Sequence, residues 1–388
     1  MRVALNLEQL FQRPPGGIGR YAAELARVLP TVGEAGEVVV LPFVARHKPE
    51  EVAEVLQAAG IGLPDGREPV VLPYPRRMLY ELWNRWGMID PVGMVGAKGR
   101  VRAPDVVHAP SVAVPPRERV PLVVTVHDAA PLRFPDTYPR RGRRFHKLGF
   151  DAAAMRADAI VAPTAVAADE VAEYTAIARE RIRPIHHGVD HTLATDDEVA
   201  QMRDELGIDD RPYVCWAGTL EPRKDVGLLV DAFARAVETQ DLPHRLVLVG
   251  PSGWLDGQEE VAGRAESLGE RVRFTGSVEP SRLRALYRGA DVFALPSRHE
   301  GFGLPALEAL AQGTTVLASD LPVLREVAGE AARFAPVGDV DAWAVSLAGL
   351  LDDPVTRSML GAAGVARAAE FTWERCAREH LEVYRSVV

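Results

Sequence analysis

The sequence predicts an α/β protein of two doubly wound, Rossmann-like domains, each built around a parallel sheet. Its 388 residues are about twice the usual length of a single domain. Short runs rich in Val and Ile alternate with segments of helical period, and a polar stretch at 187–212 interrupts them. We therefore expect domains over residues 1–195 and 196–370, and a C-terminal helix over 371–388 that packs back toward the first domain.

Each expected strand is a short apolar run bounded by turn residues, as in strands buried on both faces of a sheet. Each expected helix repeats apolar residues every three to four positions. In the first half, the strands are expected at 2–8, 37–44, 104–110, 121–128 and 158–164, and the helices at 17–30, 49–60 and 165–174. In the second half, the strands are expected at 212–218, 245–250, 271–276, 291–297 and 314–320, and the helices at 226–237, 281–290, 304–313 and 341–351. Ligands of such sheets bind at the carboxyl ends of the strands, here in a cleft between the domains.

The composition excludes several classes of protein. Hydrophobic residues make up 47% and charged residues 26%, which is globular rather than disordered. The net charge of -9 argues against a protein that wraps nucleic acid. Two cysteines, Cys215 and Cys376, are too few for a disulfide framework or a structural zinc site. The scarcity of cysteine fits a reducing compartment, so we expect a cytoplasmic protein. No apolar run is long enough to span a bilayer, although the protein can contact the inner face of the membrane.

A glycine-rich loop follows the first expected strand and opens a helix. Gly16 and Gly17 let backbone N–H groups approach an anion closely, and the amino end of the helix adds partial positive charge. These residues predict a phosphate site. A plain tight turn is the alternative, because the loop lacks the G-x-G-x-x-G pattern and its acidic partner.

A second loop, after the strand at 212–218, carries adjacent cations. It contains Gly218, Thr219, Arg223 and Lys224, and Lys224 is one of four lysines in the chain. Two cations at the carboxyl end of a strand suit a diphosphate. The alternative is a solvated surface pair.

The most informative stretch is Ser297–Glu308, where a strand ends in a glycine-bearing loop that opens a helix. Its backbone amides point toward a bound anion, as at other exposed helix amino ends. The residues that supply these amides are Gly301, Phe302, Gly303 and Leu304. A carboxylate accepts two hydrogen bonds from a vicinal diol, so one of Glu300 and Glu308 could hold a sugar ring and the other a ribose.

At this point the chain resembles a known family, the retaining glycosyltransferases of family 4, which have the GT-B fold of two facing Rossmann-like domains. Glu300 and Glu308 match the E-x7-E motif of that family. The other matching segments are GGIGRY, GTLEPRKDVGLLVDAF, RLVLVGPSG, VRFTGSV and DVFALPSRHEGFGLPALEALAQGTTVLASD. The resemblance covers nearly the whole chain.

The resemblance implies a nucleotide-sugar donor held mostly by the second domain. Glu300 would contact hydroxyls of the donor sugar, and Glu308 would hold the ribose. Arg223 and Lys224 would neutralise the diphosphate. The chain departs from the G-R-L pattern of many members with Gly218-Thr219-Leu220, which leaves those two cations in that role. Gly250 and Val278 would flank the base.

His127 is the candidate histidine of the first domain, because it follows a strand that faces the expected cleft. In the family, a histidine in this context lies beside the reacting sugar, and we expect His127 to orient it. Retention in the family is described as front-face attack, which needs no protein nucleophile. A satisfied structural histidine is the alternative.

We expect no metal or other cofactor. Asp339-Val340-Asp341 imitates the D-x-D metal motif of the other common glycosyltransferase fold. It precedes a helix, however, and helix capping explains Asp339 without a metal.

Two segments, 76–86 and 139–147, are candidates for acceptor binding or for peripheral contact with a membrane, because arginines stand beside aromatic residues. The alternative is that Trp83 and Trp86 are core residues and that the arginines form a solvated face.

The predicted reaction is transfer of a hexose from a nucleoside diphosphate sugar to a hydroxyl of a glycan, lipid-linked or small-molecule acceptor. The resemblance of GTLEPRKD to members that act in polysaccharide assembly favours mannose from GDP-mannose. The alternatives are a sugar-nucleotide epimerase, a phosphorylase with a pyridoxal cofactor, and a non-catalytic nucleotide-sugar or glycan-binding protein. A dinucleotide oxidoreductase fits least, since the glycine loop lacks an acidic partner.

Overall fold

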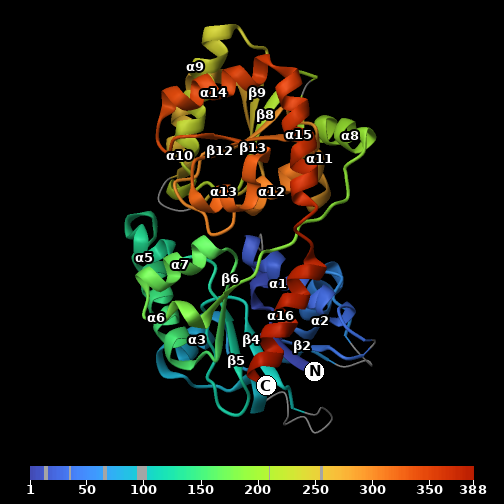
Figure 1. Ribbon diagram of the computed structural model, residues 1–388, viewed down its shortest axis with the longest axis vertical. Helices are drawn as coiled ribbons and strands as arrows, with labels where there is room; N and C mark the ends of the chain where they lie inside the picture. The colour runs from blue at the N-terminus through green and yellow to red at the C-terminus, as the bar shows by residue number, and fades with distance from the viewer. Residues whose placement is uncertain (13–15, 35, 64–67, 94–102, 209, 254–256) are drawn as a thin grey trace. The chain divides into compact units, whose positions relative to one another are not determined.

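The computed structural model describes residues 1–12, 16–34, 36–63, 68–93, 103–208, 210–253 and 257–388. These residues divide into two compact units (Figure 1). The first unit comprises Met1–Pro135, Arg140–Gly188 and Thr372–Val388, and the second comprises Asp136–Pro139 and Val189–Phe371. Each unit contains one parallel sheet flanked by helices, so the predicted fold class is confirmed.

The sheet of the first unit has the strand order β3-β2-β1-β4-β5-β6-β7, and all its pairs are parallel. Its strands are β1 (Arg2–Asn6), β2 (Val39–Val44), β3 (Val70–Val71), β4 (Val106–Ala109), β5 (Leu122–Thr125), β6 (Ala159–Ala162) and β7 (Ile182–Pro184). Its α-helices are α1 (Gly16–Val28), α2 (Pro49–Ala58), α3 (Arg76–Glu81), α5 (Ala130–Arg133), α6 (Arg140–Arg156), α7 (Ala165–Tyr174) and α16 (Trp373–Val387).

The sheet of the second unit has the order β10-β9-β8-β11-β12-β13, again with all pairs parallel. Its strands are β8 (Tyr213–Ala217), β9 (Arg245–Val249), β10 (Val272–Gly276), β11 (Val292–Leu295), β12 (Thr315–Ser319) and β13 (Ala332–Ala335). Its α-helices are α8 (Asp196–Leu206), α9 (Val226–Gln240), α10 (Gly257–Ala265), α11 (Pro280–Arg288), α12 (Leu304–Ala311), α13 (Pro322–Ala328), α14 (Val340–Asp352) and α15 (Pro354–Ala368).

Both faces of the first sheet are buried, because alternate residues of each strand point to opposite sides. On β1, Val3 and Leu5 join one apolar cluster and Ala4 joins the other. The first cluster also contains Trp373 and Tyr384 of α16. The C-terminal helix is therefore part of the core of the first unit.

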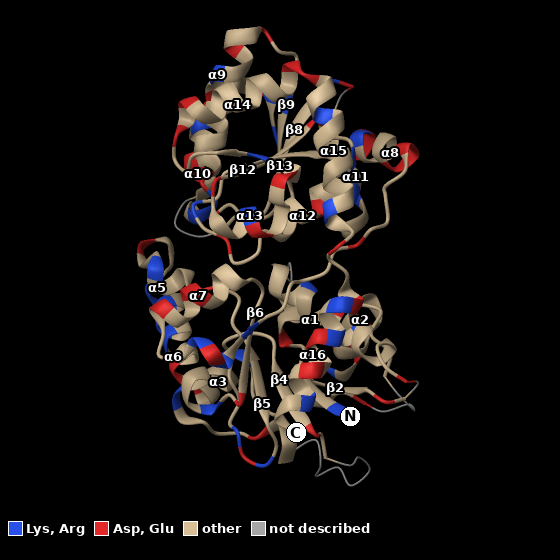
Figure 2. Cartoon of the chain, in the orientation of Figure 1, with Lys and Arg blue, Asp and Glu red and all other residues tan. Residues whose placement is uncertain are grey.

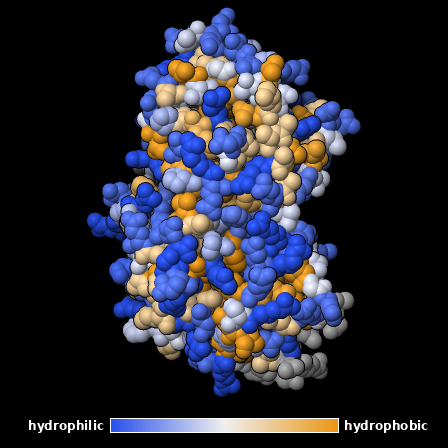
Figure 3. Space-filling model, viewed as in Figure 1, coloured by the Kyte–Doolittle hydropathy of each residue, from blue (hydrophilic) through white to orange (hydrophobic). Residues whose placement is uncertain are grey.

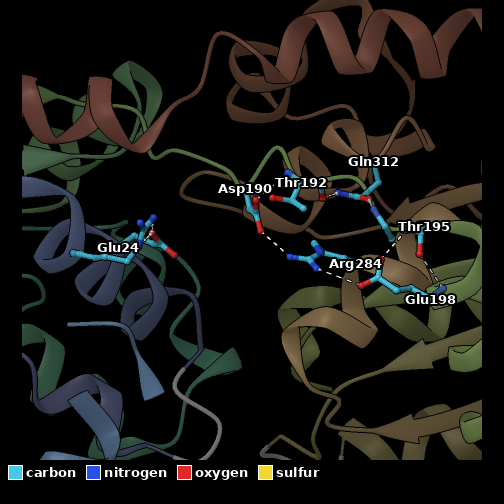
Figure 4. Close-up of polar contacts among 9 residues, drawn as sticks. Glu24, Asp190, Thr192, Thr195, Glu198, Arg284 and Gln312 are labelled. Atoms are coloured by element: carbon cyan, nitrogen blue, oxygen red, sulfur yellow. Dashed lines mark hydrogen bonds and ion pairs between the residues drawn. The ribbon is translucent and has the colours of Figure 1, made fainter. Parts of the chain in front are cut away.

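The units divide between Gly188 and Val189, seven residues before the predicted boundary at 195. The segment 189–195 is held to the rest of the second unit by the side chains of Arg284 in α11 and Gln312, the residue after α12 (Figure 4). Arg284 of α11 donates to Asp190 Oδ2 (3.0 Å) and lies 3.9 Å from Glu198 Oε1. Gln312 accepts from the Ala194 amide (2.9 Å) and donates to a backbone carbonyl. The polar residues of segment 189–195 therefore serve to bond this segment to the helices of the second unit.

Candidate active site

The candidate site of the second unit lies where two neighbouring strands end. β8 and β11 are adjacent, and the strand order runs outward from them in opposite directions, which makes this pair the topological switch point. The loops that follow these strands are joined by the amide of Arg298, which donates to the carbonyl of Arg223 (2.9 Å). The Arg223 guanidinium returns a hydrogen bond to the carbonyl of His299 (2.6 Å). Residues 76 positions apart are therefore held together.

Glu300 is the centre of this junction. Its Oε1 accepts hydrogen bonds from Lys224 Nζ (2.7 Å) and from the Ser297 hydroxyl (2.7 Å). Its Oε2 lies 3.6 Å from Arg223 Nη1. Glu300 is only 8% exposed and Lys224 only 9%. Within the described residues, Oε2 makes no hydrogen bond, so its lone pairs can accept hydroxyls of a ligand.

The charge of Glu300 is set by a competition between burial and its neighbours. Burial raises the pKa of the carboxyl group, but the positive charges of Lys224 and Arg223 and two hydrogen bonds outweigh it. The resulting pKa is about 2, against an ordinary value of 4.5. Glu300 is therefore a carboxylate at neutral pH. It can accept hydrogen bonds or stabilise positive charge, but it cannot donate a proton as a general acid.

A second carboxylate, Glu221, shares the Arg223 guanidinium. Its Oε1 lies 2.5 Å from Arg223 Nη2, and both side chains are largely buried. The sequence predicted Arg223 and Lys224 as a cationic pair, and the structure brings them together with two carboxylates. The four side chains form a buried cluster with balanced formal charge, which holds both cations in fixed positions.

The loop between the two glutamates turns sharply into α12. Gly303 has φ 85°, and a Cβ there would lie 2.4 Å from Leu324 Cδ2, so this position requires glycine. The Phe302 side chain is buried and packs edge-on against Phe371, with ring centroids 6.1 Å apart. A contact from Phe302 to a ligand must therefore involve its backbone. Glu308, inside α12, is buried and accepts a hydrogen bond from the Tyr287 hydroxyl (2.9 Å).

The remaining candidates of the second unit follow successive strands on the same edge of the sheet. Gly218 and Thr219 follow β8, Gly250 follows β9, and Val278 lies two residues beyond β10. A Cβ on Gly250 would lie 1.8 Å from the carbonyl oxygen of Gly218, so only glycine lets these two loops approach. The sequence predictions therefore fall along one edge, from β10 to β11.

In the first unit, His127 follows β5 at the carboxyl edge of the sheet. Its Nε2 donates to the carbonyl of Pro110 (2.9 Å), and the ring of Tyr21 packs edge-on at 5.2 Å. Burial lowers the pKa of His127, so the imidazole is neutral. Because Nε2 carries the proton, Nδ1 presents a lone pair.

The predicted glycine loop begins α1. Gly16 has φ 65°, which requires glycine, whereas a Cβ on Gly17 would meet no atom within 4 Å. Both residues are exposed. Residues 13–15 of the same loop lie outside the described part of the chain.

Two family models match the chain. The model described as Glycosyltransferase Family 4 matches residues 15–193, and the model described as Glycosyl transferases group 1 matches residues 198–367. A D-inositol 3-phosphate glycosyltransferase of Corynebacterium glutamicum (strain R) is 31% identical over 286 residues, which cover 70% of this chain and 68% of that protein. The chain belongs to glycosyltransferase family 4. The predicted family is confirmed, and the protein is a glycosyltransferase of the GT-B type.

Other proteins are similar to this family 4 glycosyltransferase at lower identity. O-antigen chain mannosyltransferase B of Escherichia coli is 28% identical over 268 residues, which cover 68% of this chain and 70% of that protein. Across the relatives compared, the chain aligns with 60% to 70% of their own length. The solved structure of Anabaena Alr3699/HepE in complex with UDP and glucose has a TM-score of 0.75 at 18% identity and full coverage of both chains. At that identity, the likeness shows the fold.

Sequence analysis of the family 4 glycosyltransferase missed a buried hydrogen-bond chain that joins α16 to the first sheet. The Tyr384 hydroxyl donates to His108 Nδ1 (2.7 Å), and His108 Nε2 donates to the Thr125 hydroxyl (2.8 Å). The Thr125 hydroxyl donates to the Tyr21 hydroxyl (2.8 Å), and the Tyr21 hydroxyl donates to His380 Nε2 (2.7 Å). His380 Nδ1 donates to the Cys376 carbonyl (2.8 Å), and because a carbonyl only accepts, every proton in this chain is oriented.

Glu221 and Ser297 lie in segments that the sequence singled out, but neither they nor Tyr287 were predicted as site residues. They lie at the ends of loops or inside helices without a spacing that distinguishes them from other polar residues. The resemblance to the family located the two glutamates, but the partners that hold them are visible only in three dimensions.

The two tryptophans of segment 76–86 have different environments in the structure. Trp83 is fully buried and donates to the Ile89 carbonyl (2.9 Å), so it is a core residue rather than part of an interfacial face. Trp86 is 61% exposed, with the Arg85 guanidinium 4.8 Å from its ring centroid. Of the two tryptophans in this candidate segment, only Trp86 is therefore exposed.

The basic segment of 139–147 forms the start of α6, and Figure 2 colours the Lys and Arg positions along the chain blue. Arg140 and Arg141 are exposed, and Arg144 lies 3.7 Å from Glu81. On the face drawn in Figure 3, hydrophobic residues lie scattered among hydrophilic ones. Among the described residues, no helix has both the length and the apolar composition needed to cross a bilayer.

The D-x-D imitation is explained by helix capping, as predicted. Asp339 accepts a hydrogen bond from the Ala342 amide (3.0 Å) at the start of α14, and Asp341 forms an ion pair with Arg235. Over the parts of the chain that the structure describes, no three side chains of His, Cys, Asp or Glu gather as metal ligands would.

Proposed function

We propose that this protein is a retaining, metal-independent hexosyltransferase that uses a nucleoside diphosphate sugar and glycosylates a hydroxyl of a glycan, lipid-linked or small-molecule acceptor. The observation that carries the proposal is Glu300, a buried carboxylate held by Lys224 and Ser297 with one oxygen available. Mannose from GDP-mannose is the proposed donor, and the name of the Escherichia coli relative supports it. The UDP and glucose bound to the Anabaena neighbour support the donor class.

In this proposal, each part of the second unit has one role. Glu300 Oε2 accepts hydroxyls of the donor sugar, and Glu308 accepts those of the ribose. Arg223 and Lys224 stabilise the diphosphate as negative charge develops on it. The amides of Gly301–Leu304 add hydrogen bonds to the sugar and the diphosphate.

The reaction forms a bond between the acceptor oxygen and the anomeric carbon of the donor. The bond from that carbon to the phosphate oxygen breaks, and its electron pair leaves with the nucleoside diphosphate. The proton of the acceptor hydroxyl passes to an oxygen of the leaving phosphate. His127 orients the sugar through the lone pair on Nδ1, since Nε2 is already bonded to Pro110.

The test is a thermal-shift panel of UDP, GDP, TDP, ADP and NAD with a chelator present, on the native protein and on Glu308→Ala. A ligand at about 100 times its Kd adds roughly 2.7 kcal/mol of stability. We expect GDP to stabilise the native protein and Glu308→Ala to lose the shift. Stabilisation by NAD alone, or by none of the five, would overturn the donor assignment.

Turnover of the matching nucleotide sugar then separates the alternatives. A transferase releases the nucleoside diphosphate and glycosylates an acceptor with the anomeric configuration of the donor retained. An epimerase would return a changed nucleotide sugar without an acceptor. A binding protein would show the thermal shift and no turnover. Loss of activity with the chelator would overturn metal independence.

A further inference from the structure

Glu221 is a buried carboxylate to which the proposed reaction assigns no role. It follows β8 in the chain and directly precedes the short 3-10 helix Pro222–Lys224, which carries Arg223 and Lys224. Glu221 is only 5% exposed, and a charged side chain is rarely buried without a partner. The partner is Arg223, whose Nη2 lies 2.5 Å from Glu221 Oε1. A negative charge therefore stands in contact with a cation that is proposed to hold the diphosphate.

Arg223 is also held by bonds that do not involve this carboxylate. Its Nη1 donates to the His299 carbonyl (2.6 Å), and its own carbonyl accepts the Arg298 amide (2.9 Å). The 3-10 helix is closed by the Lys224 amide, which donates to the backbone carbonyl of Glu221 (3.0 Å) and so survives a change of that side chain. A glutamine in place of Glu221 would keep a carbonyl acceptor for the guanidinium. Such a substitution therefore removes the charge and leaves the position of Arg223 supported.

The formal charges of the ion-paired cluster balance. Arg223 and Lys224 supply two positive charges, and Glu221 and Glu300 supply two negative ones. Glu300 is proposed to accept hydroxyls of the donor sugar, so its charge is tied to that role. The charge of Glu221 therefore decides whether the cluster is neutral or carries an excess positive charge.

The product of the proposed reaction carries more negative charge than the donor. In a nucleotide sugar, each phosphate of the diphosphate is linked on both sides and keeps a single ionisable oxygen. Breaking the bond to the sugar leaves a terminal phosphate with one link, which carries roughly 1.5 to 2 negative charges at pH 7. Positive charge therefore attracts the nucleoside diphosphate more strongly than the nucleotide sugar.

An excess positive charge in this cluster would oppose turnover. It would hold the product more tightly than the donor, and release of product limits the rate of many enzymes. The effect would be strong here, because salt screens buried charges less than exposed ones. The side chains of Arg223 and Glu221 are only 13% and 4% exposed. A negative charge beside Arg223 therefore favours release of the product.

We propose that Glu221 is a counter-charge that weakens the hold of Arg223 on the nucleoside diphosphate and so speeds its release. Glu221 acts through Arg223 and does not itself contact the substrate. This inference rests on the proposed transferase function. The alternative is that Glu221 only clamps Arg223 in place. The two roles differ in sign, because loss of a counter-charge tightens nucleoside diphosphate binding and loss of a clamp weakens it.

The test compares four full-length proteins by calorimetry: native, Glu221→Gln, Arg223→Gln and the double variant. The probe is GDP, or whichever of UDP, TDP and ADP stabilises the native protein in its place. We expect Glu221→Gln to bind the probe about fivefold to fiftyfold more tightly than the native protein, and Arg223→Gln to bind it more weakly by a similar factor. The double variant restores the charge balance, so it should bind more tightly than Arg223→Gln.

A clamp predicts different results from the same four proteins. Glu221→Gln would then bind the probe more weakly, and the double variant would show no recovery over Arg223→Gln, since no guanidinium is left to hold. Either result would overturn the counter-charge. The recovery can be measured even if Glu221→Gln alone fails to fold, because it compares only Arg223→Gln and the double variant.

Glu205→Gln is the matched control. Glu205 is a carboxylate of the second unit that pairs with Arg282, with 44% of its side chain exposed. The variant removes the same charge as Glu221→Gln, but outside the cluster, so binding of the probe should stay within about twofold of native. Equal tightening in Glu205→Gln would show that the net charge of the unit sets the affinity, and it would overturn the assignment to Glu221.

Kinetics with the nucleotide sugar and acceptor of the turnover assay test the release step. In a single turnover, Glu221→Gln should form product at least as fast as the native protein, because excess positive charge also stabilises the leaving diphosphate. In steady state its kcat should fall, product should appear in a burst, and inhibition by the nucleoside diphosphate should strengthen. An unchanged kcat together with tighter product binding would overturn the role in release.

The outcomes separate this inference from the proposed function. If a nucleoside diphosphate binds the native protein and Glu221→Gln binds it no more tightly, the counter-charge is wrong and the donor assignment stands. If Glu221→Gln binds it more tightly but no nucleotide sugar is turned over, the counter-charge stands as a control of nucleotide affinity and the proposed reaction is wrong. If no nucleoside diphosphate binds either protein, both are wrong.

Discussion

Lys224 Nζ lies 2.7 Å from Glu300 Oε1, in a buried ion pair that joins the loops after β8 and β11. Taking both charges out of water costs free energy, and their attraction and added hydrogen bonds offset it. Ser297 supplies the added hydrogen bond to Glu300. The pair therefore contributes more to the position of the carboxylate than to net stability.

Removing Lys224 should destabilise the second unit. Lys224→Met leaves Glu300 charged and without its nearest partner, which typically costs about 3 to 5 kcal/mol for a buried pair. The measurement is the free energy of unfolding in urea. Lys147→Met is the matched control, because Lys147 is exposed and pairs with Asp151 at 3.2 Å, so it should change stability by about 1 kcal/mol or less.

The double variant Lys224→Met with Glu300→Gln separates charge from packing. It removes both charges, so we expect it to recover most of the stability lost by Lys224→Met while transferase activity stays absent. No recovery would indicate that the lysine acts through packing alone.

Tyr287→Phe tests whether the tyrosine positions Glu308. The hydroxyl donates to Glu308 Oε2 (2.9 Å), and its loss leaves the carboxylate with one fewer partner. We expect KM for the nucleotide sugar to rise about threefold to tenfold with little change in kcat. The reason is that the lost hydrogen bond contributes roughly 1 kcal/mol to holding Glu308 in place. A fall in kcat at constant KM would contradict a positioning role, and Glu308→Gln should exceed the tyrosine variant in its effect on KM.

The sequence predicts the central parts of this structure better than its edges. β8, β9, β11 and β12 are apolar runs, and each was expected within two residues of its bounds. Of the four edge strands, β10 was expected at 271–276, whereas β3, β7 and β13 were missed, because an edge strand needs burial on fewer sides. β7, Ile182–Pro184, has only one buried residue.

In the candidate site, the sequence likewise predicts individual residues but not the contacts between them. Glu300 and Glu308 were predicted because their loop matches a family motif, and Lys224 because cations at a strand end suit a diphosphate. The ion pair between Lys224 and Glu300 was not predicted, since it depends on β8 and β11 being neighbours.

Gly250→Ala should disturb the packing between the loops that follow β8 and β9 in the second unit. Its Cβ would lie 1.8 Å from the Gly218 oxygen, so the loops after β8 and β9 must separate. We expect destabilisation of at least about 2 kcal/mol and loss of the nucleoside diphosphate thermal shift. Gly349→Ala is the control: it lies inside α14 with open space around its Cβ position, and alanine there should stabilise by about 0.5 to 1 kcal/mol.

The hydrogen-bond chain from Tyr384 to the Cys376 carbonyl requires neutral histidines, which makes the attachment of α16 sensitive to acid. Burial lowers the pKa of His380 to about 4 from an ordinary value of 6.5, and it lowers the pKa of His108 as well. Between pH 4 and pH 6.5, His380 therefore binds more protons in the unfolded chain than in the folded one. The stability contributed by neutral His380 is therefore present above pH 6.5 and lost as the pH falls toward 4.

Thermal unfolding between pH 7.5 and pH 4 measures this effect. We expect Tm to fall with pH in the native protein, with faster amide exchange in α16 than in β4 or β5. His380→Gln should be less stable at pH 7.5 and should show a shallower dependence on pH, because one titrating group is removed. His191→Gln, at an exposed site of the second unit, is the control and should keep the native slope. An unchanged slope in His380→Gln would show that other groups govern the acid response.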